Sequence, residues 1–237
     1  MKRSAKIGIG VGIAVVVVVG AAAIAGPIVY RDFISGTPDA VPTVAATTPA
    51  QGGALDPASP AGPVDLSGEW TVGDGSFAGY RVKEVLNGTD VTVTGRTEQV
   101  SGTLTVEGTT LTAATISVDV GSIATEEPSR DAYFRDSALQ VDEFPTATFD
   151  LTSPVTASST PTSGEIQTVS ASGDLTIHGV TRPVTVELQA VLSGTGGQVS
   201  GSIPITFSDF GVEAPSLGFV TVEDTGSVEF LLDIVPA

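Results

Sequence analysis

The chain has a single histidine, His178, and Arg182 lies four residues after it. An imidazole transfers protons near neutral pH, and a guanidinium binds phosphate or quinone oxygens. One histidine cannot supply a histidine-rich metal site, and the absence of cysteine excludes thiolate catalysis and zinc–thiolate sites. We therefore expect His178 either to bond the local backbone in a turn or to contact a ligand head group. Catalysis is the weakest alternative.

Arg130 and Asp131 form a second pair of ionisable residues. They either pair to fix a short helical segment, or the guanidinium contacts a quinone or phosphate head group. Asp119, Asp174 and Asp209 lie near predicted strand ends, where turn and capping roles are typical. The chain lacks the Gly-x-Ser-x-Gly, His-Glu-x-x-His, Walker and dinucleotide-binding patterns, so we predict that it is not an enzyme.

The net charge of the chain is −17 over 237 residues. Lys2, Arg3 and Lys6 precede an apolar stretch, and all 27 acidic residues follow it. This negative field repels phosphate backbones and anionic lipid surfaces, so we expect no nucleic-acid partner. The acidity is expected to keep an exported domain soluble. A calcium site is not indicated, because the Asp-x-Asp-x-Asp-Gly pattern is absent.

The N-terminal part predicts a membrane anchor. Residues Ile7 to Tyr30 carry no charge, and as a helix these 24 residues would span about 36 Å, against roughly 30 Å of hydrocarbon. The basic residues before them place that end in the cytoplasm. We predict a cytoplasmic tip and a transmembrane signal-anchor over residues 1–33, with the C-terminal domain outside the cytoplasm. The alternative is a secreted protein, because Ala23-Ile24-Ala25 resembles a signal-peptide cleavage site.

Residues 34–65 are rich in Pro, Ala and Thr and show no periodicity. This composition predicts a semi-stiff linker that tethers the following domain without docking on it.

Residues 66–237 consist of short runs in which apolar and polar residues alternate. One run ends at Leu86 and precedes Asn87-Gly88, a strong signal for a two-residue hairpin turn. About eight to ten such runs are separated by Gly, Ser or Pro, which predicts a single all-β domain, a barrel or a sandwich. Helical spacing occurs only between Pro128 and Val141, where we expect a short helix or ordered loop across one end.

Ordered motifs along the same residues resemble the YceI-like family. The run Gly-Asp-Leu-Thr-Ile-His-Gly-Val-Thr-Arg-Pro-Val, from Gly173 to Val184, is similar to the signature hairpin of that family. The sequence departs from the family pattern at Gly75-Ser76, where His-Ser is frequent, and at Tyr133-Phe134, where His-Leu is frequent. The other similar segments are Gly68 to Trp70, Gly75 to Val82, Val118 to Thr125, Arg130 to Phe134, Phe144 to Phe149, Ser208 to Val212 and Val228 to Val235.

The resemblance implies an antiparallel, lipocalin-like barrel of about eight strands that binds a polyisoprenoid lipid. The Val-, Ala-, Thr- and Gly-rich strands fit a hollow interior and a packed sandwich equally well, and the resemblance favours the hollow interior. We therefore expect an extracytoplasmic binding protein for an isoprenoid or similar amphipathic lipid, of quinone or polyprenyl type, for storage, shielding or transfer. The alternative is a non-enzymatic cell-envelope interaction or stress-response module with a filled barrel.

Ligand contacts are expected from residues near the interior and rim of this barrel. No metal ligand, catalytic residue or cofactor is expected beyond a bound isoprenoid lipid or quinone. The N-terminal helix is expected to provide the membrane contact, and the sequence does not identify a protein partner. The candidate ligand-binding residues are Tyr80, Val82, Arg130, Tyr133, Phe134, Phe144, Phe149, Ile177, His178, Arg182, Phe207 and Phe210.

Overall fold

The computed structural model describes residues 38–45, 65–86, 88–157, 159–216 and 220–237. The predicted signal-anchor over residues 1–33 lies outside the described residues, as does most of the predicted linker. Within the described ranges, no helix combines the length and the apolar character that a membrane crossing requires.

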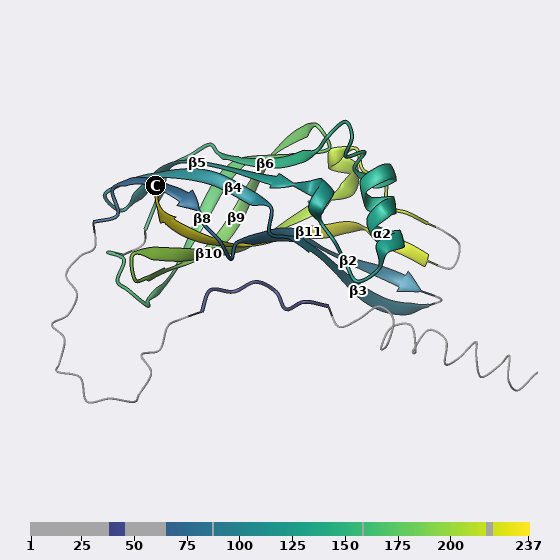
Figure 1. The fold of residues 1–237 in the computed structure, drawn as a ribbon, viewed down its shortest axis with the longest axis horizontal. Helices are drawn as coiled ribbons and strands as arrows, with labels where there is room; N and C mark the ends of the chain where they lie inside the picture. The colour runs from purple at the N-terminus through teal and green to yellow at the C-terminus, as the bar shows by residue number, and fades with distance from the viewer. Residues whose placement is uncertain (1–37, 46–64, 87, 158, 217–219) are drawn as a thin grey trace, which may run out of the picture.

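Antiparallel strands make up most of the described chain (Figure 1). They form one sheet in the order β1-β4-β5-β6-β8-β9-β10-β11-β2-β3, with β7 beside β5. A further pairing of β1 with β11 closes the sheet on itself. The strands are β1 Gly68–Val72, β2 Phe77–Leu86, β3 Thr89–Thr97, β4 Val100–Glu107, β5 Thr110–Asp119, β6 Thr146–Leu151, β7 Val155–Thr156, β8 Ile166–Ile177, β9 Val180–Ser193, β10 Gly196–Thr206 and β11 Val220–Pro236.

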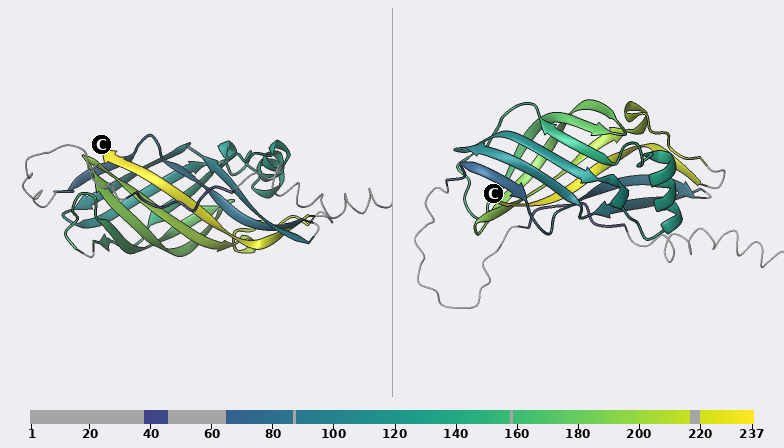
Figure 2. Two further views of the ribbon diagram at one scale, coloured as in Figure 1. Left: turned by 90° about the horizontal axis from the view of Figure 1, so that it is seen from below. Right: turned by 45° about the horizontal axis from the view of Figure 1, so that its top comes forward.

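The wall of the barrel consists of eight continuous strands, because three pairs of the strands lie end to end beside the same neighbours. β1 and β2 both run beside β11. β4 and β3 run beside β1 and β2 in turn, and β6 and β7 both pair with β5. The result is the antiparallel barrel of eight strands with one short helix that the sequence predicts, seen from two further sides in Figure 2.

The turn between β8 and β9 consists of His178 and Gly179, with φ values of 51° and 70°. Two successive positive φ angles are typical of a type I′ turn, whose twist matches that of a hairpin. Histidine is among the residues enriched in this backbone region. A Cβ on Gly179 would overlap the ring of Phe144, so the second turn position also needs glycine for steric reasons. His178 lies in the turn, as predicted, but its ring bonds the main-chain oxygen of Phe210, 32 residues away, and not the local backbone.

Helical segments cover one end of the barrel, which we call the closed end (Figures 1 and 2). α2 (Pro128–Tyr133) begins with a proline in its first turn, and the Glu127 carboxylate accepts a hydrogen bond from the Ser129 amide. A π-helical turn, η3 (Phe134–Ala138), continues it. The expected helix between Pro128 and Val141 is therefore confirmed, with its end at Ala138. Two 3₁₀ turns, η2 (Val120–Ser122) and η4 (Phe207–Phe210), complete the helical segments.

Residues 38–45 lie against the outer wall of β2 and β3, and we call them the strap (Figure 1). Arg81 and Arg96 donate to the main-chain oxygens of Asp39 and Ala40, at 2.7 and 2.6 Å. The expectation of a linker that does not dock is wrong for these residues. An extended, proline-containing segment has no internal hydrogen bonds, so its carbonyls remain available to the two arginines.

Candidate ligand-binding site

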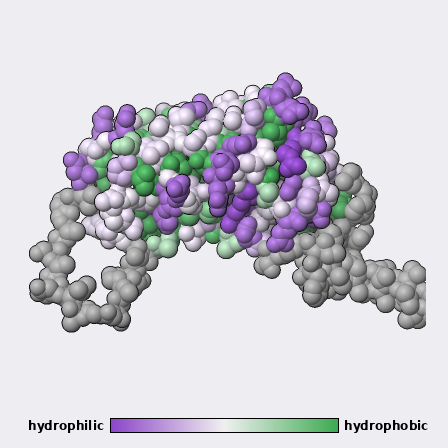
Figure 3. All heavy atoms as spheres, viewed as in Figure 1, coloured by the Kyte–Doolittle hydropathy of each residue, from purple (hydrophilic) through white to green (hydrophobic). Residues whose placement is uncertain are grey.

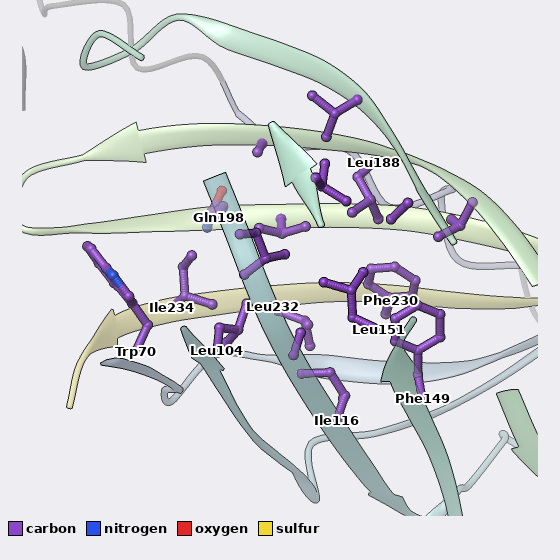
Figure 4. Close-up of a pocket in the computed structure, with 18 of the residues that line it drawn as sticks. Trp70, Leu104, Ile116, Phe149, Leu151, Leu188, Gln198, Phe230, Leu232 and Ile234 are labelled. Atoms are coloured by element: carbon purple, nitrogen blue, oxygen red, sulfur yellow. The ribbon is translucent and has the colours of Figure 1, made fainter. Parts of the chain in front are cut away.

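An elongated cavity of about 260 Å³ lies inside the barrel (Figure 4). Figure 4 shows side chains from several strands directed into it, among them Trp70, Leu104, Ile116, Phe149 and Phe230. The lining is almost entirely aliphatic or aromatic. Ligand pockets usually measure 300–1,000 Å³, so this cavity suits a slender apolar ligand.

The alternation of β8 shows how one strand contributes to the lining. Gln167, Val169, Ala171, Leu175 and Ile177 all face inward and line the cavity. The backbone between Gln167 and Ile177 extends about 33 Å at about 3.3 Å per residue. A strand tilt of about 35–45° reduces this to about 25 Å along the barrel axis. The cavity is therefore long for its volume.

Small inward residues keep the cavity open. The strand alanines of the lining come from β2, β5, β6, β8 and β9, so most sides of the barrel contribute one, and Ala157 lies just after β7. Larger side chains at these positions would fill the space. The strand alanines are Ala78, Ala114, Ala147, Ala171 and Ala190.

The cavity stops before the closed end. Ile177 and Ile203 belong both to its lining and to the apolar cluster that packs the closed half of the barrel. Val120, Leu139 and Phe210 are buried in that cluster and do not line the cavity. The barrel is hollow in one half and packed in the other, which favours the hollow interpretation over a barrel filled throughout.

The opposite end of the cavity, which we call the mouth, carries most of its polar side chains: Thr109, Glu165, Gln167 and Gln198. Thr109 and Glu165 are exposed. Gln198 donates to a carboxylate oxygen of Asp233 at 2.8 Å. Among the described residues, Glu165 is the one ionisable side chain of the lining. Amides and a carboxylate hydrogen-bond a neutral polar head group, whereas a carboxylate repels an anionic one.

None of the basic residues in the described part of the chain lines the cavity. Arg81 forms two hydrogen bonds with Glu229, at 2.6 and 3.0 Å. Arg182 donates to the main-chain oxygen of Asp209 at 2.8 Å. These cations neutralise or position parts of the protein, and the mouth is left without a positive group. The complete set is Arg81, Lys83, Arg96, Arg130, Arg135 and Arg182.

Two of the predicted ligand-binding residues, Phe149 and Ile177, line the cavity. The others lie in the packed half of the barrel, in its turns or on its outer surface, and their contact with a ligand stays a prediction without support from the cavity. They are Tyr80, Val82, Arg130, Tyr133, Phe134, Phe144, His178, Arg182, Phe207 and Phe210.

Arg130 and Asp131 fix the closed end. Arg130 Nη2 lies 3.3 Å from Oε1 of Glu84, which is buried on β2. Asp131, also buried, accepts hydrogen bonds from the amide and the hydroxyl of Thr125, at 2.9 and 2.7 Å. The two residues fix the helical segment, as expected, but they do so through separate partners and not by pairing with each other.

Tyr80 lies beside this pair, and its ring stacks on Phe134 with centroids 4.9 Å apart. Burial raises the pKa of its phenol to about 12. Nearby Arg130 opposes this rise by favouring the phenolate, and the carboxylates of Asp131 and Glu84 add to it. Tyr80 is thus a neutral packing residue at physiological pH.

His178 connects the β8–β9 hairpin to η4. Its Nδ1 lies 3.3 Å from the main-chain oxygen of Phe210, so Nδ1 carries the proton and donates. The edge of the ring meets Phe144, with centroids 4.7 Å apart. Nε2 is buried and has no hydrogen-bond partner among the described residues. Those residues also contain no cluster of side chains that could hold a metal ion.

Most residues of the lining, including Trp70, Leu104 and Leu188, are not among those predicted from the sequence. A usable signal was present in β11, where Val228, Phe230, Leu232 and Ile234 recur at every second position and all line the cavity. Such a run in the final strand identifies an inward face, although not a hollow one.

Comparison with known proteins settles the family. The sequence profile of the YceI-like domain matches residues 70–234. The chain belongs to the YceI-like family. UPF0312 proteins from Pseudomonas aeruginosa strains LESB58 and UCBPP-PA14 are relatives, each 30% identical over 126 residues. The match covers 50% of this chain, which spans 59% of the length of those relatives.

Two solved structures share this YceI-like fold. A polyisoprenoid binding domain from Saccharophagus degradans, implicated in plant cell wall breakdown, is 21% identical with a TM-score of 0.57, and the match covers 71% of this chain and 98% of that domain. BcnA from Burkholderia cenocepacia is 21% identical with a TM-score of 0.51, over 65% of this chain and 95% of BcnA. At this identity the likeness demonstrates the fold alone.

Proposed function

We propose that this YceI-like protein binds an isoprenoid or similar amphipathic lipid inside its barrel, for storage, shielding or transfer. The observation that carries the proposal is the long apolar cavity, with polar side chains gathered at one end. Membership of the family and the fold shared with a polyisoprenoid binding domain support it.

Burial of the tail supplies the binding free energy. Each CH₂ removed from water contributes about 0.8 kcal/mol, so a five-carbon isoprene unit contributes about 3–4 kcal/mol before the costs of association. Three or four buried units, at about 3–4 kcal/mol each, then give useful affinity without a strong polar contact. Tail length is expected to dominate affinity.

The mouth favours an uncharged head group. Within the described part of the chain, its one ionisable residue, Glu165, is acidic, and the other polar groups there are amides and a hydroxyl. A quinone or prenol can accept hydrogen bonds from the amides, whereas a phosphate meets like charge and no cation. Within the isoprenoid class, we therefore place quinones ahead of polyprenyl phosphates.

We also propose that residues 1–33 anchor the protein in a membrane, with the barrel outside the cytoplasm. The uncharged stretch from Ile7 to Tyr30 and the basic residues before it support this orientation. Secretion after cleavage is the alternative, and the intact mass of the membrane-extracted protein distinguishes the two. A binding role fits the lining, whose described residues offer no pair of groups for acid–base or nucleophilic chemistry.

Native mass spectrometry of the full-length protein, purified in mild detergent from its own host, tests the lipid proposal. We expect a bound species that organic solvent releases and that has the mass of an isoprenoid lipid. Protein purified empty should take up menaquinone. A protein that arrives without lipid, and that takes up neither menaquinone nor polyprenyl phosphate, would contradict the proposal and favour the envelope interaction module.

A further inference from the structure

The chain enters the barrel at the mouth. Leu66 and Trp70 line the cavity, and the Trp70 indole donates to the main-chain oxygen of Leu66 at 2.9 Å. Trp70 and Gln198 lie at the same end of the cavity in Figure 4. A tether that ran freely into Asp65 would therefore hold the barrel by its mouth.

The docked strap attaches the barrel to the N-terminal part of the chain at a different place, on the outer side of β3. The Asp39 amide donates to the Thr94 hydroxyl at 3.1 Å, and one residue later the Ala40 carbonyl accepts from Arg96. The strap thus runs in the direction of β3, which continues into β4 and toward the mouth. Pro38, the first residue of the strap, is its end farther from the mouth (Figure 1).

The barrel holds the two arginines in place independently of the strap. Both contacts of Arg81 with Glu229 are hydrogen bonds to a carboxylate that is 4% exposed. The Arg96 guanidinium lies 4.4 Å from the centre of the Phe77 ring, in a cation–π contact. The receptor for the strap is therefore preformed, and the strap itself adds the carboxylate of Asp39, 3.3 Å from Arg96 Nε.

We propose that the strap reverses the barrel with respect to its N-terminal attachment, so that the mouth faces away from it. This inference rests on the proposed membrane anchor for the identity of that attachment. Seven residues separate Tyr30 from Pro38, a reach of at most about 25 Å. With the strap released, 34 residues separate Tyr30 from Asp65, a reach of about 110 Å that ends at the mouth.

The docked strap and the released strap give the binding site different exchange partners. The docked strap turns the mouth toward the space beyond the anchoring membrane, where a soluble or opposing carrier exchanges lipid with it. The released strap lets the mouth turn to the membrane itself. The Asp39–Arg96 pair is partly exposed, with side chains 50% and 26% accessible, so ionic strength shifts the balance toward release.

Single-cysteine probes on the full chain test this orientation, because the chain has no native cysteine. A bimane label is placed at the closed end with Tyr133→Cys, or beside the mouth with Glu107→Cys, and the protein is reconstituted in vesicles that contain nitroxide-labelled lipid. We expect quenching at 133 to be at least twice that at 107. Asp39→Lys places a cation against Arg96 and should bring the ratio to one or below. Asp90→Lys, the same charge change elsewhere on β3, should leave it unchanged.

Equal quenching at both sites before substitution, or an unchanged ratio in Asp39→Lys, would overturn the orientation. A second measurement needs no membrane: the anisotropy of a label at Val41→Cys, on the exposed side of the strap, should fall with Asp39→Lys and not with Asp90→Lys. No fall would overturn strap docking. If the anisotropy falls but the protein is not recovered with the vesicles, the membrane anchor is refuted and the lipid-binding proposal is untouched.

Discussion

Ala114 and its neighbour Ala113 show how single side chains determine the space inside this barrel. Ala114 faces inward, is buried and lines the cavity, whereas Ala113 is exposed on the outer face. Strand alternation therefore puts two identical side chains in opposite environments. The capacity of the barrel depends on a few such inward methyl groups.

Ala114→Leu should weaken binding of an isoprenoid quinone by about tenfold or more, because the added carbons displace about two to three CH₂ groups of the tail at about 0.8 kcal/mol each. Ala113→Leu is the matched control and should bind like the unsubstituted protein. Fluorescence titration with menaquinone gives both affinities, and circular dichroism verifies the fold. Equal affinities in the two variants would place the tail outside the cavity.

Glu165 determines the charge at the mouth. Glu165→Lys should improve binding of a polyprenyl phosphate by several-fold at low salt, since an exposed charge pair at about 4 Å contributes about 1 kcal/mol. Menaquinone affinity should change little. Glu187→Lys, on the outer face of β9, makes the same charge change away from the cavity. The comparison uses competition titrations at two salt concentrations, and an equal gain in both variants would indicate a general charge effect.

Tyr80 makes the stability of the barrel depend on alkaline pH. Its folded-state pKa of about 12 lies above the ordinary value of 10.0, so the unfolded chain loses this proton first. Between about pH 10 and 12 the folded state binds more protons, and stability falls as pH rises, by about 2–3 kcal/mol in total. Urea unfolding at several pH values should show a smaller fall for Tyr80→Phe than for Tyr133→Phe, whose tyrosine is 37% exposed.

At this scale the sequence identified structural residues better than ligand contacts. His178, Arg130 and Asp131 were recognisable as special, and their polar atoms stabilise a turn and the closed end. The cavity is lined instead by aliphatic side chains that resemble any other core residue. Nothing in the spacing of Leu104 or Leu188 distinguishes a wall of a cavity from a packed interior, because that depends on the side chain across the barrel.

Among the elements, α2 closes one end through a buried ion pair. Arg130 reaches from α2 to Glu84 on β2, and both side chains are largely removed from water. Loss of one partner leaves the other buried without compensation, which is far more costly than loss of an exposed pair.

Arg130→Ala should therefore lower the free energy of unfolding by about 3 kcal/mol. Arg135→Ala, one helical turn further along the same segment, removes an arginine that has no ion pair within the described chain and should cost much less. Urea denaturation of both variants decides the point. Similar losses would show that the pair with Glu84 contributes little to holding α2.

The elements differ in how far the sequence predicts them. Alternation and turn residues predict the strands, and the short helix follows from the spacing after Pro128. The docking of the strap was not predictable, because its carbonyls contact Arg81 and Arg96 from a segment with no apolar pattern of its own. Every residue has a main-chain carbonyl, so the residue types in a sequence do not indicate which carbonyls accept such hydrogen bonds.

The two halves of the barrel differ along its axis. The mouth half is hollow and lacks basic residues in its lining, and the closed half is packed around apolar clusters with arginine pairs beside them. The outer face in Figure 3 has only small apolar patches, interrupted by hydrophilic side chains. If the barrel binds lipid as we propose, exchange is expected through the mouth.

The pairing of β1 with β11 has a consequence for biogenesis. Trp70–Val72 pair with Ile234–Pro236, so the first strand finds its second neighbour only when the last strand has been made. Such distant pairing slows folding, since the intervening loop must close before the contact stabilises anything. The barrel wall therefore closes only after β11 has been synthesised, and the cavity inside it is complete only once β1 and β11 have paired.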